Sequence, residues 1–192
     1  MLEFSEELDR KILLFVNGYH NHFFDVFMYW CSGQYSWIPF YVLLVLLIFL
    51  KLKKKAIPFI LLVALLLTIS DQMASSVFKP FFHRFRPSHE PGLEDLLHYV
   101  NNYRGGMYGF VSSHAANTFS LAFYFFFTIK KQMPKLTLIL FFWAALVSYS
   151  RVYLGVHYPS DVVVPIFFIA IGNGFMIAKL YIWIEKRYFP NT

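Results

Sequence analysis

The segment from Ser150 to Asp161 places an arginine, a histidine and an aspartate between two apolar runs, and reads S-R-V-Y-L-G-V-H-Y-P-S-D. Ionisable groups beside membrane-like sequence are costly unless they pair with each other or with a ligand. Pro159 suits the first turn of a helix, so we expect His157 and Asp161 to lie one turn apart, where the carboxylate can hydrogen-bond one imidazole nitrogen. The other imidazole nitrogen is then free to act as a nucleophile.

Cations in two separate segments are suited to holding the oxygens of a phosphate group. Arg151, in the histidine segment, carries a planar guanidinium whose donors match phosphate oxygens. Lys79 and Arg86 open a long polar connection and are seven residues apart, two helical turns, so both can face one point. Taken alone, this pair fits better with side chains that snorkel to lipid headgroups. We expect His83 and Arg84, between them, to be surface or supporting residues.

A third segment, Val111-Ser112-Ser113-His114, precedes an apolar run that predicts a helix. Small residues there would place hydroxyls and free backbone N–H groups at a helix N-terminus, which favours anions. His114, one residue inside this helix, is positioned to protonate a leaving oxygen. The alternative interpretation makes Ser112 a simple N-cap and His114 a residue of the membrane interface.

The composition is typical of a protein embedded in a membrane. Hydrophobic residues make up 58% of the 192 residues and charged residues 15%, whereas soluble domains average about 45–50% apolar and about 25% charged. The formal net charge of +6 is carried by basic residues at the ends of apolar runs, which indicates orientation in a bilayer and not nucleic-acid binding. The single cysteine, Cys31, excludes an internal disulfide and a multi-cysteine metal site.

Five apolar runs predict transmembrane helices in an all-α integral membrane bundle, at residues 37–50, 56–78, 115–129, 136–149 and 162–184. The preceding segment holds two apolar clusters among charged residues, neither long enough to span a bilayer. We therefore expect two amphipathic helices in the membrane interface over residues 1–34, followed by a transmembrane catalytic bundle over 35–187. Asp71, within the second run, is either a packing partner for a nearby cation or part of the functional site.

Clusters of Lys and Arg orient these helices consistently. They occur at residues 51–55, 130–135 and 186–187, which fall on one side of the membrane if the chain crosses it five times. The positive-inside rule makes that side cytoplasmic. The connections at 79–111 and 150–160, which carry the unusual chemistry, are then expected to meet at the outer surface.

The three motifs together resemble the type 2 phosphatidic acid phosphatase (PAP2) family. They read K-x6-R-P from Lys79, S-S-H from Ser112 and S-R-x3-G-x-H-x3-D from Ser150, in that order, and the resemblance covers about residues 35–185. The third motif matches fully. The family's middle motif is usually P-S-G-H, whereas this chain has Val111 and Ser113 in place of the proline and glycine. The resemblance implies a helical core like that of these phosphatases and the haloperoxidases.

The resemblance also implies a role for each candidate residue. His157 would attack phosphorus to form a phosphohistidine that water hydrolyses, Asp161 would orient His157, and His114 would act as general acid and then as base. The phosphoryl oxygens would be held by Lys79, Arg86, Arg151 and the backbone of Ser112 and Ser113. No cluster of carboxylates indicates a Mg²⁺ or Zn²⁺ site, so we expect metal-independent activity and no cofactor.

The implied function is a membrane lipid phosphatase of the bacterial inner membrane whose active site faces the outside. Its expected partners are a lipid phosphate substrate and the bilayer, and no nucleic acid. Undecaprenyl diphosphate is the first choice of substrate, with lipid A phosphates and phosphatidylglycerol phosphate as alternatives. The sequence leaves the substrate and the oligomeric state open.

Three other interpretations are weighed against this one. Vanadium haloperoxidases resemble the same motif set, but they are soluble, whereas this chain has five predicted spans. A non-catalytic lipid-binding protein would have no reason to keep His114, His157 and Asp161 together. A small transporter would be expected to carry paired interrupted helices at the membrane midplane, and nothing in the sequence resembles them.

Overall fold

A computed structural model describes residues 2–190, and the side chains from residue 6 onward, so residue 1 of the expected N-terminal segment lies outside this description. Within the described residues the only β-type pairing is an isolated bridge between Phe85 and Tyr108. The helices are α1 (Leu2–Gly18), α2 (His22–Ser32), α3 (Ile38–Leu52), α4 (Ala56–Gln72), α5 (Lys79–Phe82), α6 (Ser113–Ile129), α7 (Pro134–Tyr153), α8 (Pro159–Pro165) and α9 (Ile171–Tyr188). The expectation of an all-α fold is confirmed.

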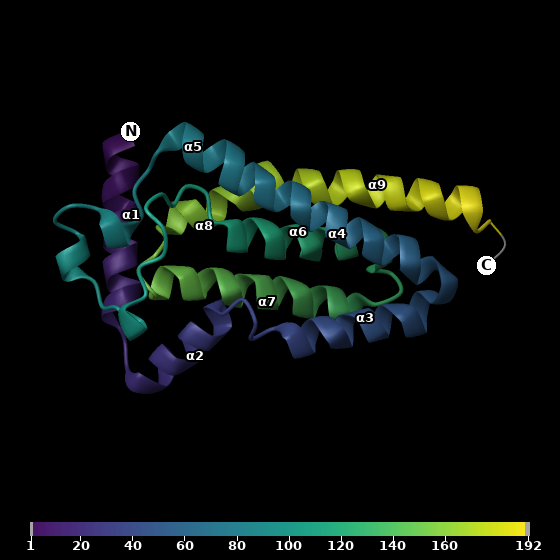
Figure 1. The fold of residues 1–192 in the computed structure, drawn as a ribbon, viewed down its shortest axis with the longest axis horizontal. Helices are drawn as coiled ribbons and strands as arrows, with labels where there is room; N and C mark the ends of the chain where they lie inside the picture. The colour runs from purple at the N-terminus through teal and green to yellow at the C-terminus, as the bar shows by residue number, and fades with distance from the viewer. Residues whose placement is uncertain (1, 191–192) are drawn as a thin grey trace.

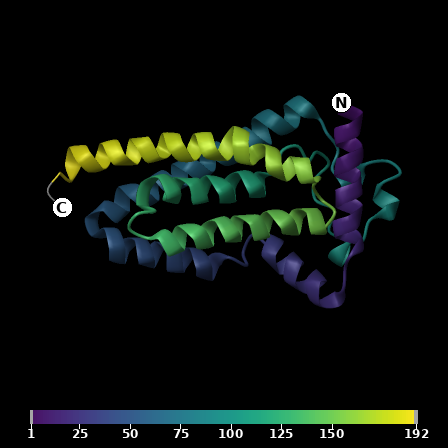
Figure 2. The same cartoon turned by 180° about the vertical axis from the view of Figure 1, so that it is seen from behind.

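Five helical rods lie along the long axis of the molecule, namely α3, α4, α6, α7 and the joined α8–α9 (Figure 1 and Figure 2). The α6 rod is central and packs against α4, α7 and α9. Its buried residues, such as Ala115, Leu121 and Tyr124, lie on several faces, as expected for a helix surrounded by others. Gly174 allows α9 to approach closely, because a Cβ there would lie 2.7 Å from Cβ of Phe123.

Three continuous helical stretches of the described chain are long and apolar enough to cross a membrane, namely Ile38–Phe82, Pro134–Tyr153 and Pro159–Tyr188. The first contains both α3 and α4, because the short 3-10 turn Lys53–Lys55 joins them without a break. The chain reverses direction at this turn, where Lys53 has a φ of 52° (Figure 1). A π-helical turn at Met73–Phe78 joins α4 to α5. The helix expected to end near residue 78 therefore continues to Phe82 and includes Lys79.

The outer surface of the rods is apolar, as a lipid environment requires. Leu50, Leu138 and Phe168 are each more than 70% exposed, although they are large and hydrophobic. A separate buried core, which includes Phe59 and Leu140, joins the rods to one another. Exposed apolar side chains around a packed interior are expected where the surrounding solvent is hydrocarbon.

Helix α1 lies across one end of the bundle, next to the long connection between α5 and α6 (Figure 1). Leu13 on this helix is fully buried and Asn17 is 1% exposed. Asn17 donates from Nδ2 to the carbonyl oxygens of His98 and Tyr153, at 3.0 and 2.8 Å, and accepts from the His98 N–H. The N-terminal helix is therefore attached to the bundle end by specific buried hydrogen bonds.

Candidate active site

His157 and Asp161 lie side by side where the chain passes from α7 into α8. Gly155 adopts a φ of 68° in the turn before them, a conformation that favours glycine. Nδ1 of His157 is 3.4 Å from Oδ2 of Asp161, and the N–H of Tyr158 donates to the same oxygen at 3.0 Å. His157 is 1% exposed and Asp161 is fully buried. The carboxylate therefore orients the imidazole with Nε2 directed away from it.

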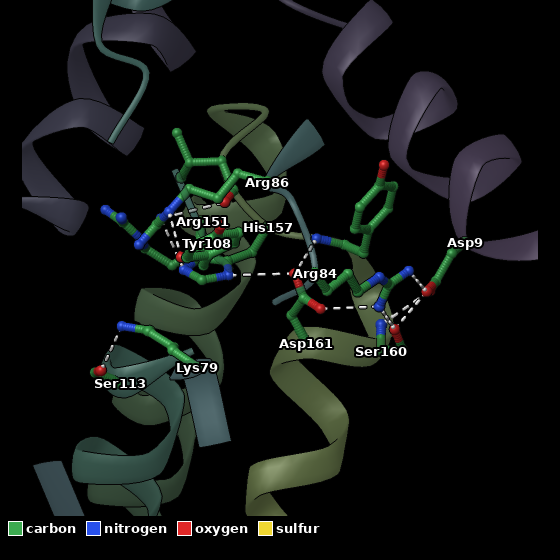
Figure 3. Close-up of polar contacts among 12 residues, drawn as sticks. Asp9, Lys79, Arg84, Arg86, Tyr108, Ser113, Arg151, His157, Ser160 and Asp161 are labelled. Carbon is green, nitrogen blue, oxygen red and sulfur yellow. Dashed lines mark hydrogen bonds and ion pairs between the residues drawn. The ribbon is translucent and has the colours of Figure 1, made fainter. Parts of the chain in front are cut away.

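Arg84 holds the other oxygen of Asp161. Its Nη1 donates to Oδ1 of Asp161 at 2.9 Å and to Oγ of Ser160 at 2.7 Å, while its Nη2 donates to Oδ2 of Asp9 on α1 at 2.8 Å (Figure 3). Burial alone would lower the pKa of Arg84, but the carboxylates of Asp161 and Asp9 raise it overall. Ser160 also donates its N–H to Oδ1 of Asp9 at 2.9 Å. Arg84 thus holds in place the Asp161 carboxylate, which in turn orients His157.

Arg86 lies on the opposite side of the histidine–aspartate pair from Arg84 (Figure 3). Its Nη1 is 3.0 Å from Nε2 of His157, and the guanidinium also donates to two backbone carbonyl oxygens. Gly109 makes room for it, because a Cβ there would lie 3.0 Å from Cγ of Arg86 and 3.1 Å from Oδ2 of Asp161. Burial, and then the charge of Arg151, lower the pKa of Arg86 to about 10, so it is cationic at neutral pH.

Arg151 and Lys79 complete the cationic side of the site. Arg151 is 2% exposed and donates to Oγ of Ser32 and, at 3.0 Å, to the hydroxyl of Tyr103. Lys79 donates from Nζ to Oγ of Ser113 at 3.0 Å. Among the described residues, neither these two cations nor Arg86 forms an ion pair with a carboxylate. Their combined positive charge is therefore available to a bound anion.

The start of α6 supplies less to a phosphate than the sequence predicts. The N–H of Ser112 donates to the carbonyl oxygen of Asp161 at 2.8 Å, so this backbone donor is already used. Oγ of Ser112 is buried and has no hydrogen-bond partner among the described residues. Ser113, the first residue of α6, remains beside Lys79. The backbone N–H of Ser112 therefore fixes the main chain at Asp161, while a contact of the Ser112 hydroxyl and of Ser113 with phosphate stays a prediction.

A cavity of about 280 Å³ opens beside His114, and we call it the headgroup cavity. It is enclosed by α2, α3, α4, α6 and α7, and its lining includes Gln34, Asp71 and Asn117 as well as His114. A larger apolar groove of about 530 Å³ runs along α3, α4 and α6 and shares Gln34 and Tyr41 with this cavity. A cavity that His114 lines, with several polar side chains in its wall, thus adjoins an apolar groove that can take lipid chains.

One group of potential metal ligands occurs in the described chain, and it involves neither His114 nor His157. Ligand atoms of His20, Asp25 and His98 lie within 4.8 Å of one another. The Asp25 carboxylate already accepts hydrogen bonds from the Tyr153 hydroxyl at 2.7 Å and from Nε2 of His98 at 3.0 Å. The two imidazole rings are stacked, with centroids 3.6 Å apart. Metal-independent catalysis stays a prediction.

Burial holds the pKa of His157 well below its ordinary value, and the charges of Arg86, Arg151 and Lys79, with the nearby His114, act in the same direction. At neutral pH the imidazole is therefore uncharged, and Nε2 keeps its lone pair. A neutral imidazole oriented by a carboxylate and surrounded by unpaired cations is suited to attack a phosphorus atom held by those cations.

Comparisons with known proteins agree with this chemistry. The family model of the PAP2 superfamily matches residues 58–188. The chain is 39% identical over 165 residues to a lipid A 4′-phosphatase of Bacteroides thetaiotaomicron, a match that covers 85% of this chain and 72% of that protein. It is 36% identical over 190 residues to a lipid A 4′-phosphatase of Porphyromonas gingivalis, covering 97% of this chain and 78% of that protein.

Two solved structures share the fold. Aquifex aeolicus LpxE superposes with a TM-score of 0.61 at 27% identity, covering 88% of this chain and 93% of that one. The transmembrane PAP2-type phosphatidylglycerolphosphate phosphatase of Bacillus subtilis gives a TM-score of 0.66 at 19% identity, covering 98% and 89%. The resemblance of the motifs is thereby confirmed, and the chain belongs to the PAP2 superfamily as a membrane lipid phosphatase.

Proposed function

We propose that this protein is a lipid A phosphatase that removes the phosphate at the 4′ position, at the outer face of the bacterial inner membrane. The observation that carries the phosphatase chemistry is the convergence of Lys79, Arg86 and Arg151, all without carboxylate partners among the described residues, around the uncharged His157. The choice of lipid A is supported by the two relatives at 39% and 36% identity. These relatives favour lipid A over undecaprenyl diphosphate, the first choice from the sequence alone.

In the first step Nε2 of His157 attacks the phosphorus atom. The N–P bond forms as the bond between phosphorus and the sugar oxygen breaks, and His114 gives its proton to that oxygen. Asp161 accepts the Nδ1–H hydrogen bond and stabilises the positive charge that develops on the imidazole. Arg86 Nη1 lies 3.0 Å from Nε2, so this guanidinium can hold a phosphate next to the nucleophile once its N–H turns from Nε2 to a phosphate oxygen.

In the second step a water molecule attacks the phosphohistidine. His114, now neutral, takes a proton from the water as the new O–P bond forms and the N–P bond breaks. Inorganic phosphate and the dephosphorylated lipid are the products, and both histidines return to their initial states. The fixed cations neutralise the phosphoryl oxygens in both steps, and positioning with charge neutralisation supplies most of the catalysis in such reactions.

The proposed orientation follows from where the charges lie in the fold. The turn Lys53–Lys55, the α6–α7 turn with Lys130 and Lys131, and the C-terminal end of α9 occupy one end of the bundle (Figure 1). The active site and α1 occupy the other end. The positive-inside rule makes the lysine-rich end cytoplasmic, so the site faces the outside, where the phosphate of an outer-leaflet lipid lies at headgroup level.

The test is phosphate release by the purified protein in detergent with chelator present. Substrates are lipid A with one phosphate at position 4′, lipid A with one phosphate at position 1, undecaprenyl diphosphate and phosphatidylglycerol phosphate. We expect release from the 4′-phosphate far above the others, and none by His157→Ala. Release mainly from another lipid would overturn the choice of substrate. Equal release by His157→Ala would overturn the mechanism and favour a non-catalytic lipid-binding protein.

A further inference from the structure

Asp71 of α4 and Asn117 of α6 form a polar pair in the wall of the headgroup cavity. Nδ2 of Asn117 donates to Oδ1 of Asp71 at 3.3 Å, the single hydrogen bond to this carboxylate among the described residues. Oδ1 of Asn117 is buried and has no partner there. An ionisable side chain within a membrane helix is costly and marks a functional site by default. The pair therefore retains hydrogen-bond acceptors beside the cavity that have no donors.

The position of the cavity identifies which part of a substrate reaches this pair. His114 and Asn117 are three residues apart on one face of α6, and both line the cavity, whereas His157 does not. In phosphoryl transfer the attacking and leaving atoms lie on opposite sides of phosphorus. His157 attacks and His114 protonates the leaving oxygen, so the leaving group occupies the headgroup cavity.

The chemistry of the pair selects among leaving groups. Its free acceptors require donors, such as the hydroxyl or amide N–H groups of a sugar ring next to the phosphate ester. A prenyl diphosphate would instead place a second phosphate in the cavity, and a phosphate anion beside the Asp71 carboxylate is repelled. A neutral sugar therefore suits this chamber, and an anionic leaving group does not.

We propose that Asp71 and Asn117 form a headgroup subsite that accepts hydrogen bonds from the hydroxyl or amide groups flanking the phosphate ester. The subsite selects sugar-headed lipids over lipids whose leaving group is itself a phosphate. This inference rests on the proposed phosphatase function of the same site and assigns to it the source of its substrate choice. It assigns Asp71 to the functional site, one of the two interpretations that the sequence leaves open.

A competing explanation is that Asp71 acts only through Lys79, with which it interacts electrostatically. In that case Asp71 would influence how the phosphate group is held, whatever the leaving group. The two explanations therefore differ in which substrates lose activity when Asp71 is replaced. A loss confined to sugar phosphates indicates contact with the headgroup, and a uniform loss indicates an effect on the cation.

The experiment compares Asp71→Ala and Asp71→Asn with the wild-type protein on three substrates in detergent. The substrates are lipid A 4′-monophosphate, undecaprenyl diphosphate and p-nitrophenyl phosphate, whose leaving group lacks the flanking donors. Thr68→Ala is the matched control, because Thr68 is exposed on α4 three residues before Asp71 and bonds only its own helix. Thermal unfolding of each variant verifies that it is folded.

We expect Asp71→Ala to lower kcat/KM for the lipid A phosphate about 10- to 100-fold more than for p-nitrophenyl phosphate, as loss of a hydrogen bond to a charged group predicts. Asp71→Asn should shift the preference towards undecaprenyl diphosphate, because it removes the repelling charge and keeps the side-chain shape. Equal loss on all three substrates, or no change in the preference, would overturn the subsite.

The proposed function can fail without the subsite failing. If the wild-type protein hydrolyses a lipid other than lipid A, the same comparison is made between that lipid and p-nitrophenyl phosphate. A selective loss in Asp71→Ala then supports the subsite for a different donor-bearing headgroup. A uniform loss or no loss overturns it.

Discussion

Arg84 donates from Nη1 to Oδ1 of Asp161 at 2.9 Å, on the carboxylate whose other oxygen faces His157. The same guanidinium is held by Asp9, a residue of the N-terminal helix. In the proposed mechanism, helix α1 therefore helps to orient His157 through a chain of two ion pairs, Asp9–Arg84 and Arg84–Asp161. This link makes the N-terminal segment part of the catalytic architecture.

Arg84→Ala should lower kcat about 10- to 100-fold with little change in KM, because Asp161 would lose its support while the phosphate cations remain. Removing one partner of a buried ion pair costs roughly 3–5 kcal/mol, so a lower melting temperature is also expected. Steady-state kinetics separate the two parameters, and Arg84→Lys should restore part of kcat. An effect on KM alone would show that Arg84 binds substrate directly.

Asp9→Asn tests the contribution of α1 without disturbing the Asp161 contact itself. We expect a smaller loss of kcat than in Arg84→Ala, because Arg84 keeps its bonds to Asp161 and Ser160. The matched control is Glu6→Gln, an exposed acidic residue of the same helix. If Asp9→Asn and Glu6→Gln behave alike, α1 is a membrane-surface helix without influence on the nucleophile.

His114→Ala should slow hydrolysis of a lipid phosphate about 10²- to 10⁴-fold, the usual contribution of a general acid. The loss in kcat/KM, which reports the first step, should be much smaller for p-nitrophenyl phosphate, because p-nitrophenolate leaves without a proton, whereas kcat should fall for both substrates because they share the second step. His157→Ala should lose both activities. Comparison of kcat/KM for the two substrates in both variants checks the assignment, which would be contradicted if His114→Ala lowered kcat/KM equally for both.

The low pKa of His157 sets the expected pH dependence. The acid limb of kcat/KM that arises from His157 should lie well below pH ~6.5, the ordinary histidine value, because burial and then the cations around the imidazole oppose its protonation. Arg86→Gln removes one of these charges and should move that limb to higher pH, even though its maximal rate is lower. An unchanged limb in Arg86→Gln would mean that another group is titrating.

The same pKa predicts how stability varies with pH. His157 is neutral in the folded protein, whereas the unfolded chain binds a proton there below pH ~6.5. The free energy of unfolding therefore has its full value with respect to His157 above this pH. It decreases as the pH falls from about 6.5 towards the folded pKa, because only the unfolded chain binds the proton there. Thermal unfolding between pH 7.5 and 5 should show a shallower loss for His157→Gln than for the wild-type protein.

The contact between His157 and Asp161 was predictable from the sequence because it is local. His157 and Asp161 lie four residues apart, and the proline between them fixes the start of a helix. The five rods were predictable from apolar runs, which are long enough to indicate membrane helices without knowledge of their packing. The long helices end within four residues of the expected positions, and the second run continues through a π-helical turn into α5.

The supporting contacts were not predictable, because they join residues far apart in the chain. Arg84 and Asp9 are 75 residues apart, and neither carries a motif. The occupied N–H of Ser112 depends on the carbonyl oxygen of Asp161 from another helix. The one available signal was the acidic, amphipathic character of the first helix, which is equally expected of a helix at a membrane surface.

The π-helical turn at Met73–Phe78 sets the rotational phase between two functional positions on one rod. In an uninterrupted α-helix, the eight residues from Asp71 to Lys79 turn through about 800°, which leaves the two side chains about 80° apart. A wider turn takes up part of that angle, so the carboxylate and the ammonium group can face the same side of the bundle. Substitutions that made this segment regular α-helix with no residue removed would leave the two side chains about 80° apart and separate headgroup selection from phosphate binding, while the apolar length of the rod stays almost unchanged.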